Sequence, residues 1–298
     1  MIHYTTCPVC GGQHIHPQLN AVDHTVSNET FAIWHCDDCT LRFTQDVPNQ
    51  DAIGAYYQSD NYISHSDSKE GLINKLYHKV RVLTLKSKRN LVLKHTGLQK
   101  GKILDIGCGT GAFLNSMQTA GWDITALEPD PTARLKAKEL YGIQPDPPGK
   151  LFELSENSYN AITMWHVLEH VHELHAYMEK ISKLLAPRGK LFIAVPNYTS
   201  KDAAAYGANW AAYDVPRHLY HFSPQSMELL AGKHGLRIAA YKPMWFDSYY
   251  VSMLSEKYKD QRGNLLKAGW NGTLSNFKAL GDAKNCSSLI YVVKKSEP

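Results

Sequence analysis

Hydrophobic positions in the middle of the chain follow two periods, one typical of buried strands and one typical of helices. Apolar residues between the strand-like runs recur every three or four positions, as Phe113, Leu114 and Met117 do. Strands that alternate with helices are joined by crossovers and pair in parallel, so this region predicts an α/β fold. The predicted strands occupy residues 102–106, 124–127, 161–165 and 191–197.

Two of the predicted helices have the capping residues that usually mark a helix start. Asp130 and Pro131 open one helix, which stops at Gly142, and Ser223 and Pro224 open another. An Asp or Ser side chain accepts hydrogen bonds from the unpaired amides of the first turn. Proline fits that turn because it has no amide hydrogen to satisfy.

The segment before the first of these strands contains a polar connector and then a helical pattern. The pattern predicts an amphipathic helix that packs against the main domain, with Lys and Arg between its apolar positions. The apolar positions are Leu72, Leu76, Val80, Leu83 and Leu91. Tyrosines in the connector, such as Tyr57, either cover a pocket or pack at a domain junction.

Four of the six cysteines form two C-x-x-C pairs, Cys7 with Cys10 and Cys36 with Cys39. Four thiolates complete a tetrahedral zinc site, and because they leave no open position such a site is structural. A redox dithiol needs only one pair, and an iron-sulfur centre uses similar ligands. We predict a zinc-ribbon module that binds Zn²⁺ through these four cysteines.

Length and charge limit the classes of function. The chain has 298 residues, enough for one α/β core and a small additional module. Its 32 Lys and Arg against 28 Asp and Glu give a net charge of +4, which does not favour nucleic acid as a partner. The N-terminus lacks a signal-peptide pattern and no apolar run approaches about 20 residues, so we expect a cytoplasmic protein that does not span a membrane.

The turn after the first of these strands is rich in glycine. Asp105 lies near the end of that strand, and Gly107-Cys108-Gly109-Thr110-Gly111 leads into a helix. Glycines let the backbone approach a ligand closely, beside the exposed amides of a helix start. Because Ala112 completes a G-x-G-x-x-A run, the loop alone fits a nicotinamide cofactor as well. Glu128, at the tip of the second strand, is placed to accept ribose hydroxyls in either case.

Residues from about 95 to 295 resemble the class I S-adenosylmethionine-dependent methyltransferases, in particular the broad group that contains ubiquinone-biosynthesis O-methyltransferases. The resemblance rests on residues 104–111, on Glu128, on Trp165-His166-Val167-Leu168-Glu169-His170 and on the turn 187–190. It implies a Rossmann-like sheet that ends in an antiparallel hairpin, formed by strands around 236–245 and 288–293. S-adenosylmethionine would be the cofactor and S-adenosylhomocysteine the product.

The resemblance also implies which residues contact this cofactor. Asp105 and the glycines would face its methionine part, Glu128 the ribose, residues 146–151 the adenine, and His166 the sulfonium. The sequence departs from the family pattern at the third strand, where Pro145, Pro147 and Pro148 crowd the expected adenine contact. The candidate cofactor-binding residues are Asp105, Gly107, Cys108, Gly109, Gly111, Glu128, Pro129, Trp165 and His166.

A loop dense in aromatic and imidazole groups follows the last parallel strand, at residues 209–222. It lies beyond the carboxyl edge of the sheet, where it can roof an acceptor pocket. Histidine suits proton removal near neutral pH, so His218 and His221 are the candidate catalytic bases, although either can serve only local hydrogen bonds. His218 is favoured because Arg217-His218-Leu219 resembles the Glu-His-Leu segment of zinc-carrying sugar C-methyltransferases, which also have a four-cysteine module. Arg217 replaces their acidic residue.

Three units are therefore expected: a zinc-ribbon module at 1–45, a connector and helix at 46–95, and a methyltransferase domain at 96–298. The predicted reaction is methylation of a small-molecule acceptor, a sugar or another biosynthetic metabolite, on oxygen or carbon with a histidine base. A nicotinamide-dependent oxidoreductase and a noncatalytic zinc-ribbon binding module are the alternatives. Residues 247–285 either shape the acceptor site or form a loose connector. Neither the acceptor nor the oligomeric state is indicated.

Overall fold

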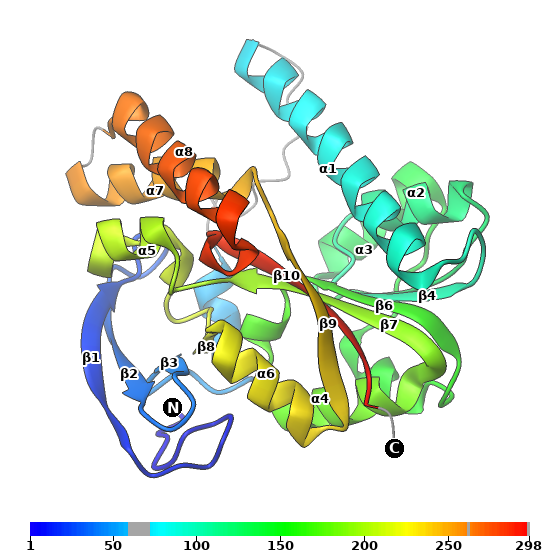
Figure 1. Cartoon of the computed structure of the whole chain (residues 1–298), viewed down its shortest axis with the longest axis horizontal. Coiled ribbons are helices and arrows are strands. Elements are labelled where there is room, and N and C mark those ends of the chain that lie inside the picture. Colours follow the sequence, from blue (N-terminus) through cyan, green and yellow to red (C-terminus); the bar gives the residue numbers. More distant parts are fainter. Residues whose placement is uncertain (59–71, 261–262, 297–298) are drawn as a thin grey trace.

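A six-stranded sheet forms the centre of the computed structural model, which describes residues 1–58, 72–260 and 263–296 (Figure 1). The order of its strands is β5-β4-β6-β7-β10-β9. Strands β4, β5, β6 and β7 pair in parallel, and β10 runs antiparallel to both β7 and β9, which confirms the expected hairpin. The strands are β4 (Lys102–Ile106), β5 (Asp123–Leu127), β6 (Tyr159–Trp165), β7 (Leu185–Pro196), β9 (Leu236–Pro243) and β10 (Ser288–Lys295).

The strand expected near residues 145–148 does not form. One isolated bridge joins Asp146 to Leu127, with hydrogen bonds from Asp146 N to Ala126 O and from Glu128 N to Asp146 O, both 2.9 Å. The prolines at 145, 147 and 148 have no amide hydrogen to continue a ladder. The third strand is thus reduced to a single residue at the edge of β5.

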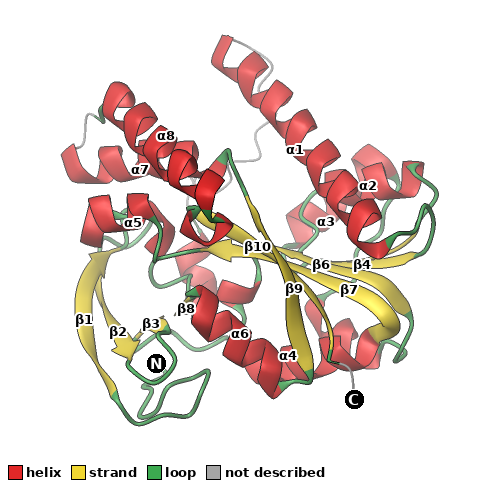
Figure 2. Cartoon of the chain, in the orientation of Figure 1, coloured by secondary structure: helices red, strands yellow, loops and turns green. Residues whose placement is uncertain are grey.

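Helices cover both faces of the sheet (Figure 2). Side chains of α1, α2 and α3 pack against one set of strand residues, which includes Ile103 and Ala161. Side chains of α4 and α6 pack against the alternate set, which includes Leu104 and Ile162. The helices are α1 (Leu72–Thr96), α2 (Ala112–Thr119), α3 (Pro131–Tyr141), α4 (Leu174–Leu184), α5 (Lys201–Tyr206), α6 (Pro224–Lys233), α7 (Asp247–Asp260) and α8 (Leu265–Gly281).

The caps of α3 and α6 are those expected. The Asp130 carboxylate accepts hydrogen bonds from the amides of Thr132 and Ala133, and Gly142 ends the helix with a left-handed φ of +69°. Ser223 forms a reciprocal capping box with Ser226. The long stretch between β9 and β10 contains two packed helices, α7 and α8, and is not a loose connector. No helix in the described part of the chain is long and apolar enough to cross a membrane.

The packed side of α1 agrees with the expected one at Leu91 and differs from it at Leu83. Leu83, which was expected on the packed side, is 55% exposed, whereas Val92 is fully buried against Phe192 and the start of α2. Only the last turns of α1 therefore lie on the sheet, and in Figure 1 the rest of the helix extends away from it. The side chains of residues 72–79 lie outside the described set.

The N-terminal residues form a second, smaller sheet with the order β1-β2-β3-β8. Its first three strands are β1 (Ile15–Val22), β2 (Thr30–Cys36) and β3 (Arg42–Thr44), which follow one another as antiparallel neighbours. The fourth, β8 (Tyr220–His221), comes from the histidine-rich loop. Phe43 pairs with Tyr220 and Arg42 with His221, so this loop is built into the N-terminal sheet.

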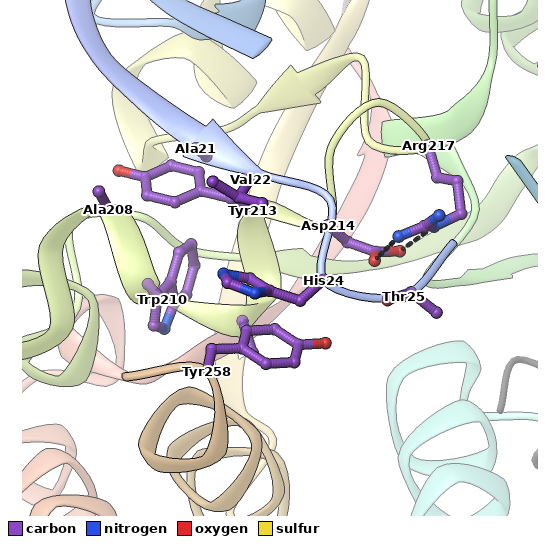
Figure 3. Close-up of a pocket in the computed structure, with 11 residues that line it drawn as sticks. Ala21, Val22, His24, Thr25, Ala208, Trp210, Tyr213, Asp214, Arg217 and Tyr258 are labelled. Carbon is purple, nitrogen blue, oxygen red and sulfur yellow. Dashed lines mark hydrogen bonds and ion pairs between the residues drawn. The ribbon is translucent and has the colours of Figure 1, made fainter. Parts of the chain in front are cut away.

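A buried ion cluster strengthens the same connection. Arg217 donates to the Asp214 carboxylate at 2.6 and 3.1 Å, to Asp23 Oδ1 at 2.9 Å and to the carbonyl of Tyr56 at 2.8 Å. The side chains of Arg217 and Asp23 are almost completely buried. Figure 3 shows Arg217 against Asp214 beside a cavity of about 10 Å³, room for no more than one water molecule. The loop therefore packs tightly on the N-terminal strands.

Replacing Asp23 by Ala should destabilise the protein strongly. The substitution removes one of the two carboxylates that neutralise a buried guanidinium, and such losses cost about 3 kcal/mol or more in the free energy of unfolding. Urea denaturation measures the change. Asp51→Ala, at an exposed position, serves as the control and should change the free energy by about 0.5 kcal/mol or less. Equal effects of the two substitutions would contradict a stabilising role for the ion cluster.

Candidate active site

The glycine-rich loop carries the chain from β4 into α2 with a backbone that side chains would strain. Gly107, Gly109 and Gly111 have φ angles of +73°, +54° and +79°. A Cβ atom at Gly107 would lie 2.4 Å from Cγ2 of Val167, whereas one at Gly109 would meet no atom of the described chain within 4 Å. The loop thus packs on the sheet at Gly107 and presents bare backbone to open space at Gly109.

Glu128 holds this loop against the end of β5. Its carboxylate accepts hydrogen bonds from Gly109 N at 2.7 Å and from Asp130 N at 2.9 Å. Arg134 donates to the carbonyls of Glu128 and Pro129 and so braces the turn. Burial raises the pKa of Glu128 above its ordinary value. A carboxylate can accept about four hydrogen bonds, so Glu128 retains acceptor capacity for a ligand hydroxyl.

Asp105 lies one residue from the end of β4 and is almost fully buried. Thr163 Oγ1, on the adjacent strand β6, donates to Asp105 Oδ1 at 2.5 Å. Burial raises the pKa of Asp105 to about 7, although this hydrogen bond and the charge of Lys88 act in the opposite direction. Asp105 is therefore a carboxyl group whose charge depends on what binds beside it.

His166 lies just past β6 in a left-handed conformation, with φ of +58°. Its two ring nitrogens meet two carboxylates: Nε2 is 2.9 Å from Asp247 Oδ2 and Nδ1 is 3.3 Å from Glu169 Oε1. Burial alone would lower the pKa of His166, but the two carboxylates raise it to about 10. His166 is consequently an imidazolium ion that donates from both nitrogens. The neighbouring Trp165 ring lies under the ammonium group of Lys88, 4.4 Å from its centroid.

Glu169, His170 and His218 form a second group, with one ligand atom from each residue within 4.8 Å of the others. One carboxylate oxygen of Glu169 contacts His166, and the other is buried without a hydrogen-bond partner among the described residues. Burial lowers the pKa of His170 to about 4, so His170 is neutral near pH 7. Burial favours the neutral form of Glu169, but His166 holds its pKa below the ordinary value. An anion therefore lies beside two histidines, a set that is also able to hold a metal ion.

His218 has one ring nitrogen engaged and one not used in any close contact of the described chain. Nδ1 lies 2.9 Å from the carbonyl of Ala212, which can only accept, so Nδ1 carries the hydrogen. Nε2 is 3.9 Å from the nearest carboxylate oxygen, on Asp214, which is beyond hydrogen-bond distance. In the unprotonated form of the ring, this tautomer leaves the lone pair on Nε2. Its ring stands edge to face with His170 at 4.5 Å.

His221 lies in a different setting, on β8 against the N-terminal sheet. Its Nε2 is 3.1 Å from Thr44 Oγ1, and its ring packs at a right angle to that of Tyr213. Burial lowers the pKa of His221 well below its ordinary value. Thr44 also donates to the carbonyl of His218 at 2.7 Å, so one threonine of the N-terminal sheet contacts both histidine positions.

The structure brings most of the expected site residues into one connected region. Asp105, the glycine loop and Glu128 lie along the ends of β4 and β5, and His166 joins the region to His218 through Glu169. Cys108 is buried in the loop, and burial raises the pKa of its thiol. Lys88 and Asp247 had no signal in the sequence that separated them from surface residues. Tyr57, whose hydroxyl lies 3.0 Å from His170 Nδ1, belongs to the connector tyrosines that the sequence pointed to.

The four cysteines of the N-terminal module converge. Cys7 Sγ lies 3.5 Å from Cys39 Sγ, and Cys10 Sγ lies 3.5 Å from Cys36 Sγ. All four sulfur atoms are within 4.8 Å of one another, and Gly12 N donates to Cys10 Sγ at 3.2 Å. Thiolates bound tetrahedrally at about 2.3 Å lie about 3.8 Å apart, so the arrangement fits a tetrahedral metal.

Comparison with known proteins agrees with this geometry. A family model described as a methyltransferase domain matches residues 77–241, more than half of the chain. A ubiquinone biosynthesis O-methyltransferase from Xanthomonas oryzae pv. oryzae is 30% identical over 42% of the chain and 56% of its own length, so the match spans little more than half of that relative. The enzyme of the same name from Nitrosococcus oceani is 31% identical over 54% of the chain and 72% of its own length.

Two solved structures share the fold at low sequence identity. A putative sarcosine dimethylglycine methyltransferase from Galdieria sulphuraria superposes with a TM-score of 0.51 at 17% identity, over 72% of this chain and 86% of its own. A 1,6-didemethyltoxoflavin-N1-methyltransferase from Burkholderia thailandensis, solved with its acceptor and S-adenosylhomocysteine, gives 0.50 at 16% identity, over 93% and 100%. At this identity the likeness establishes the arrangement of the sheet and helices.

Asp247→Asn should lower the pKa of His166, because the substitution removes one of the two anions that hold the imidazolium. Histidine side-chain NMR measures this pKa, and Asp46→Asn, at the exposed partner of His3, should leave it unchanged. Since folding raises the pKa from 6.5 to about 10, the stability that His166 contributes should be complete below pH 6.5 and lost as the pH rises through 10. A pKa near 6.5 for His166 in the wild type would contradict the claim that Asp247 and Glu169 stabilise its charged form.

Proposed function

This chain belongs to the class I S-adenosylmethionine-dependent methyltransferases, and from that membership we propose that it methylates a small-molecule acceptor with His218 as the general base. Bound S-adenosylmethionine supplies the methyl group from its sulfonium. The bare backbone at Gly109 and the carboxylates of Asp105 and Glu128 suit an adenosine and an amino acid group. The full set of proposed cofactor contacts is Asp105, Gly107, Cys108, Gly109, Gly111, Glu128, Pro129, Trp165 and His166.

One observation carries the choice of His218: its Nε2 lone pair, kept available by the hydrogen bond from Nδ1 to Ala212 O. In the proposed reaction the carbon-sulfur bond breaks, a bond forms between the methyl carbon and an oxygen or carbon of the acceptor, and the acceptor proton passes to Nε2. Glu169 supports this step because its negative charge lies beside the imidazolium that forms. His170 supports it because it is neutral and does not repel that imidazolium.

Arg217 does not take over the role of the acidic residue that precedes the histidine in the sugar C-methyltransferases. Its guanidinium is engaged with Asp23 and Asp214. Two carboxylates lie near His218: Asp214, which is paired with Arg217 and has Oδ2 at 3.9 Å from Nε2, and Glu169, which has an oxygen within 4.8 Å of a ring nitrogen. Because Asp214 is engaged by Arg217, we propose the same proton chemistry, for an alcohol, a phenol or a carbon acid, with Glu169 as the carboxylate that supports His218 from a separate segment. His221 is assigned to packing because its ring is buried against Thr44 and Tyr213.

His218→Asn should lower kcat by about 10² to 10⁴-fold, since a positioned base contributes roughly that factor. Acceptors are first identified by measuring S-adenosylhomocysteine formation with sugar nucleotides, quinol precursors and phenols. Calorimetry should show unchanged S-adenosylhomocysteine affinity in the variant. His175→Ala, at an exposed histidine, is the matched control and should retain full activity.

Two results would separate failure of the base from failure of the function. Unchanged kcat in His218→Asn, with an acceptor that the wild type methylates, would refute the base and leave the methyltransferase intact. Binding of NADH without any binding of S-adenosylhomocysteine would refute the methyltransferase and favour an oxidoreductase on the same loop. Binding of neither ligand would favour a noncatalytic module.

We also propose that Cys7, Cys10, Cys36 and Cys39 hold one structural Zn²⁺ in a module that spans residues 1–45. Residues 46–95 then form the connector and α1, and residues 96–298 the methyltransferase domain. The four sulfurs leave no open coordination position for a substrate. The pairing of β3 with β8 supports a structural role for the module, because it joins the strands beside the four cysteines to the loop that carries His218.

Elemental analysis should find about one zinc per chain, and Cys36→Ser should lose it. Cys286→Ser, at a buried cysteine outside the cluster, should retain the zinc and is the control. Removal of zinc by a chelator should lower the Tm, because the module no longer supports β8. Iron in place of zinc, or full zinc content in Cys36→Ser, would contradict the assignment.

A further inference from the structure

The hairpin of α7 and α8 buries small side chains and exposes large apolar ones, which is the opposite of what surface helices of globular proteins usually do. The face of α8 that packs on the protein is formed by small residues: Ala268, Gly272, Ser275 and Ala279. The buried face of α7 is also mostly small, with Ser248, Ser252 and Ser255. A Cβ atom at Gly272 would lie 2.7 Å from Cδ1 of Tyr249, so the two helices approach closely. The hairpin therefore buries small side chains and leaves the large ones outside.

The outer face of α8 is an apolar stripe. Leu266, Trp270, Phe277 and Leu280 are 89, 65, 71 and 71% exposed, with Thr273 between the two aromatic residues. The spacings of four, three, four and three residues place all five on one side of the helix. None of the five is charged, which is the pattern of a helix seam and not of a solvent-facing helix.

The apolar surface continues from α8 onto α7. Tyr249 Oη lies 3.3 Å from Thr273 Oγ1, at the centre of the stripe, and Asn276 donates to the carbonyl of Trp245. Trp245, Phe246, Tyr249, Tyr250 and Met253 are each between 39 and 54% exposed. At roughly 150 to 250 Å² for a large side chain, the two helices and the two residues just before α7 together expose on the order of 1,000 Å² of apolar surface. The largest apolar patch of an ordinary monomer is about 300 to 600 Å².

We propose that this face binds the same face of a second copy of the chain, with the two α8 helices antiparallel across a twofold axis near Thr273. A twofold interface requires a surface that is complementary to itself. The stripe meets this requirement because the order of its side chains is nearly symmetric about Thr273. In an antiparallel pair of α8 helices, Leu266 of one copy lies opposite Leu280 of the other, and Trp270 lies opposite Phe277. A stable interface buries about 800 Å² on each partner, which the exposed area supplies. The proposal does not depend on the methyl acceptor or on the catalytic base.

Sedimentation velocity at micromolar concentration should show a dimer for the wild type. Phe277→Glu and Trp270→Glu should each raise the dimer Kd by about 30-fold or more, because each substitution enters the interface twice and at its centre. Leu135→Glu, at a residue of α3 that is 56% exposed, is the matched control and should leave the dimer intact. Circular dichroism should show that every variant keeps the wild-type fold, since the substituted side chains lie outside the core, and Tm values should be compared at one protein concentration because dimerisation itself raises Tm.

A cysteine at the proposed axis tests the geometry independently. Thr273→Cys should form a disulfide between two chains under mild oxidation, while Leu135→Cys should not. A wild type that is monomeric would overturn the proposal, and so would a dimer that Phe277→Glu does not weaken. A monomer that binds phosphatidylcholine and phosphatidylglycerol vesicles through Trp270 would identify a lipid-facing surface and would also overturn it.

Discussion

The buried guanidinium of Arg217 constrains the structure around the histidine-rich loop. A buried charge persists only where opposite charges and hydrogen-bond acceptors surround it, and here these come from the N-terminal module, the connector and the loop itself. Asp23, the carbonyl of Tyr56 and Asp214 supply them. Three segments distant in sequence must therefore meet at one point. The strand pairing of β3 with β8 then sets the register, and His218 occupies the position next to it.

The N-terminal module is consequently part of the framework of the proposed active site. Thr44 connects the two, since its hydroxyl donates to the carbonyl of His218 and contacts the ring of His221. The four clustered cysteines lie at the other end of the module, next to the end of β2 and the start of β3. A structural metal at this place would act on catalysis only by keeping β8, and with it His218, in position. This is a mechanical connection and requires no contact between metal and substrate.

The charges and burial around the histidines of the site give them different protonation states. His166 is cationic because Asp247 and Glu169 face its two nitrogens, whereas His170 is neutral because burial outweighs the neighbouring anion. The environment, and not the residue type, thus separates a fixed charge from groups able to exchange a proton. Asp247 comes from the start of α7, so the helical hairpin that displays the apolar stripe also supplies one of the charges of the site.

The sequence by itself determined the parallel sheet, the helix caps, the glycine loop and the paired cysteines, because each depends on residues that are near one another in the chain. It also indicated Glu128, His166 and His218 through the motifs and the family resemblance in which they occur. Only the tertiary structure decided that the third strand shrinks to Asp146, that Leu83 is exposed, and that His221 belongs to the N-terminal sheet. Asp247 and Lys88 reach the site from α7 and α1 across long separations, and such contacts follow from packing, which leaves no local pattern in the sequence.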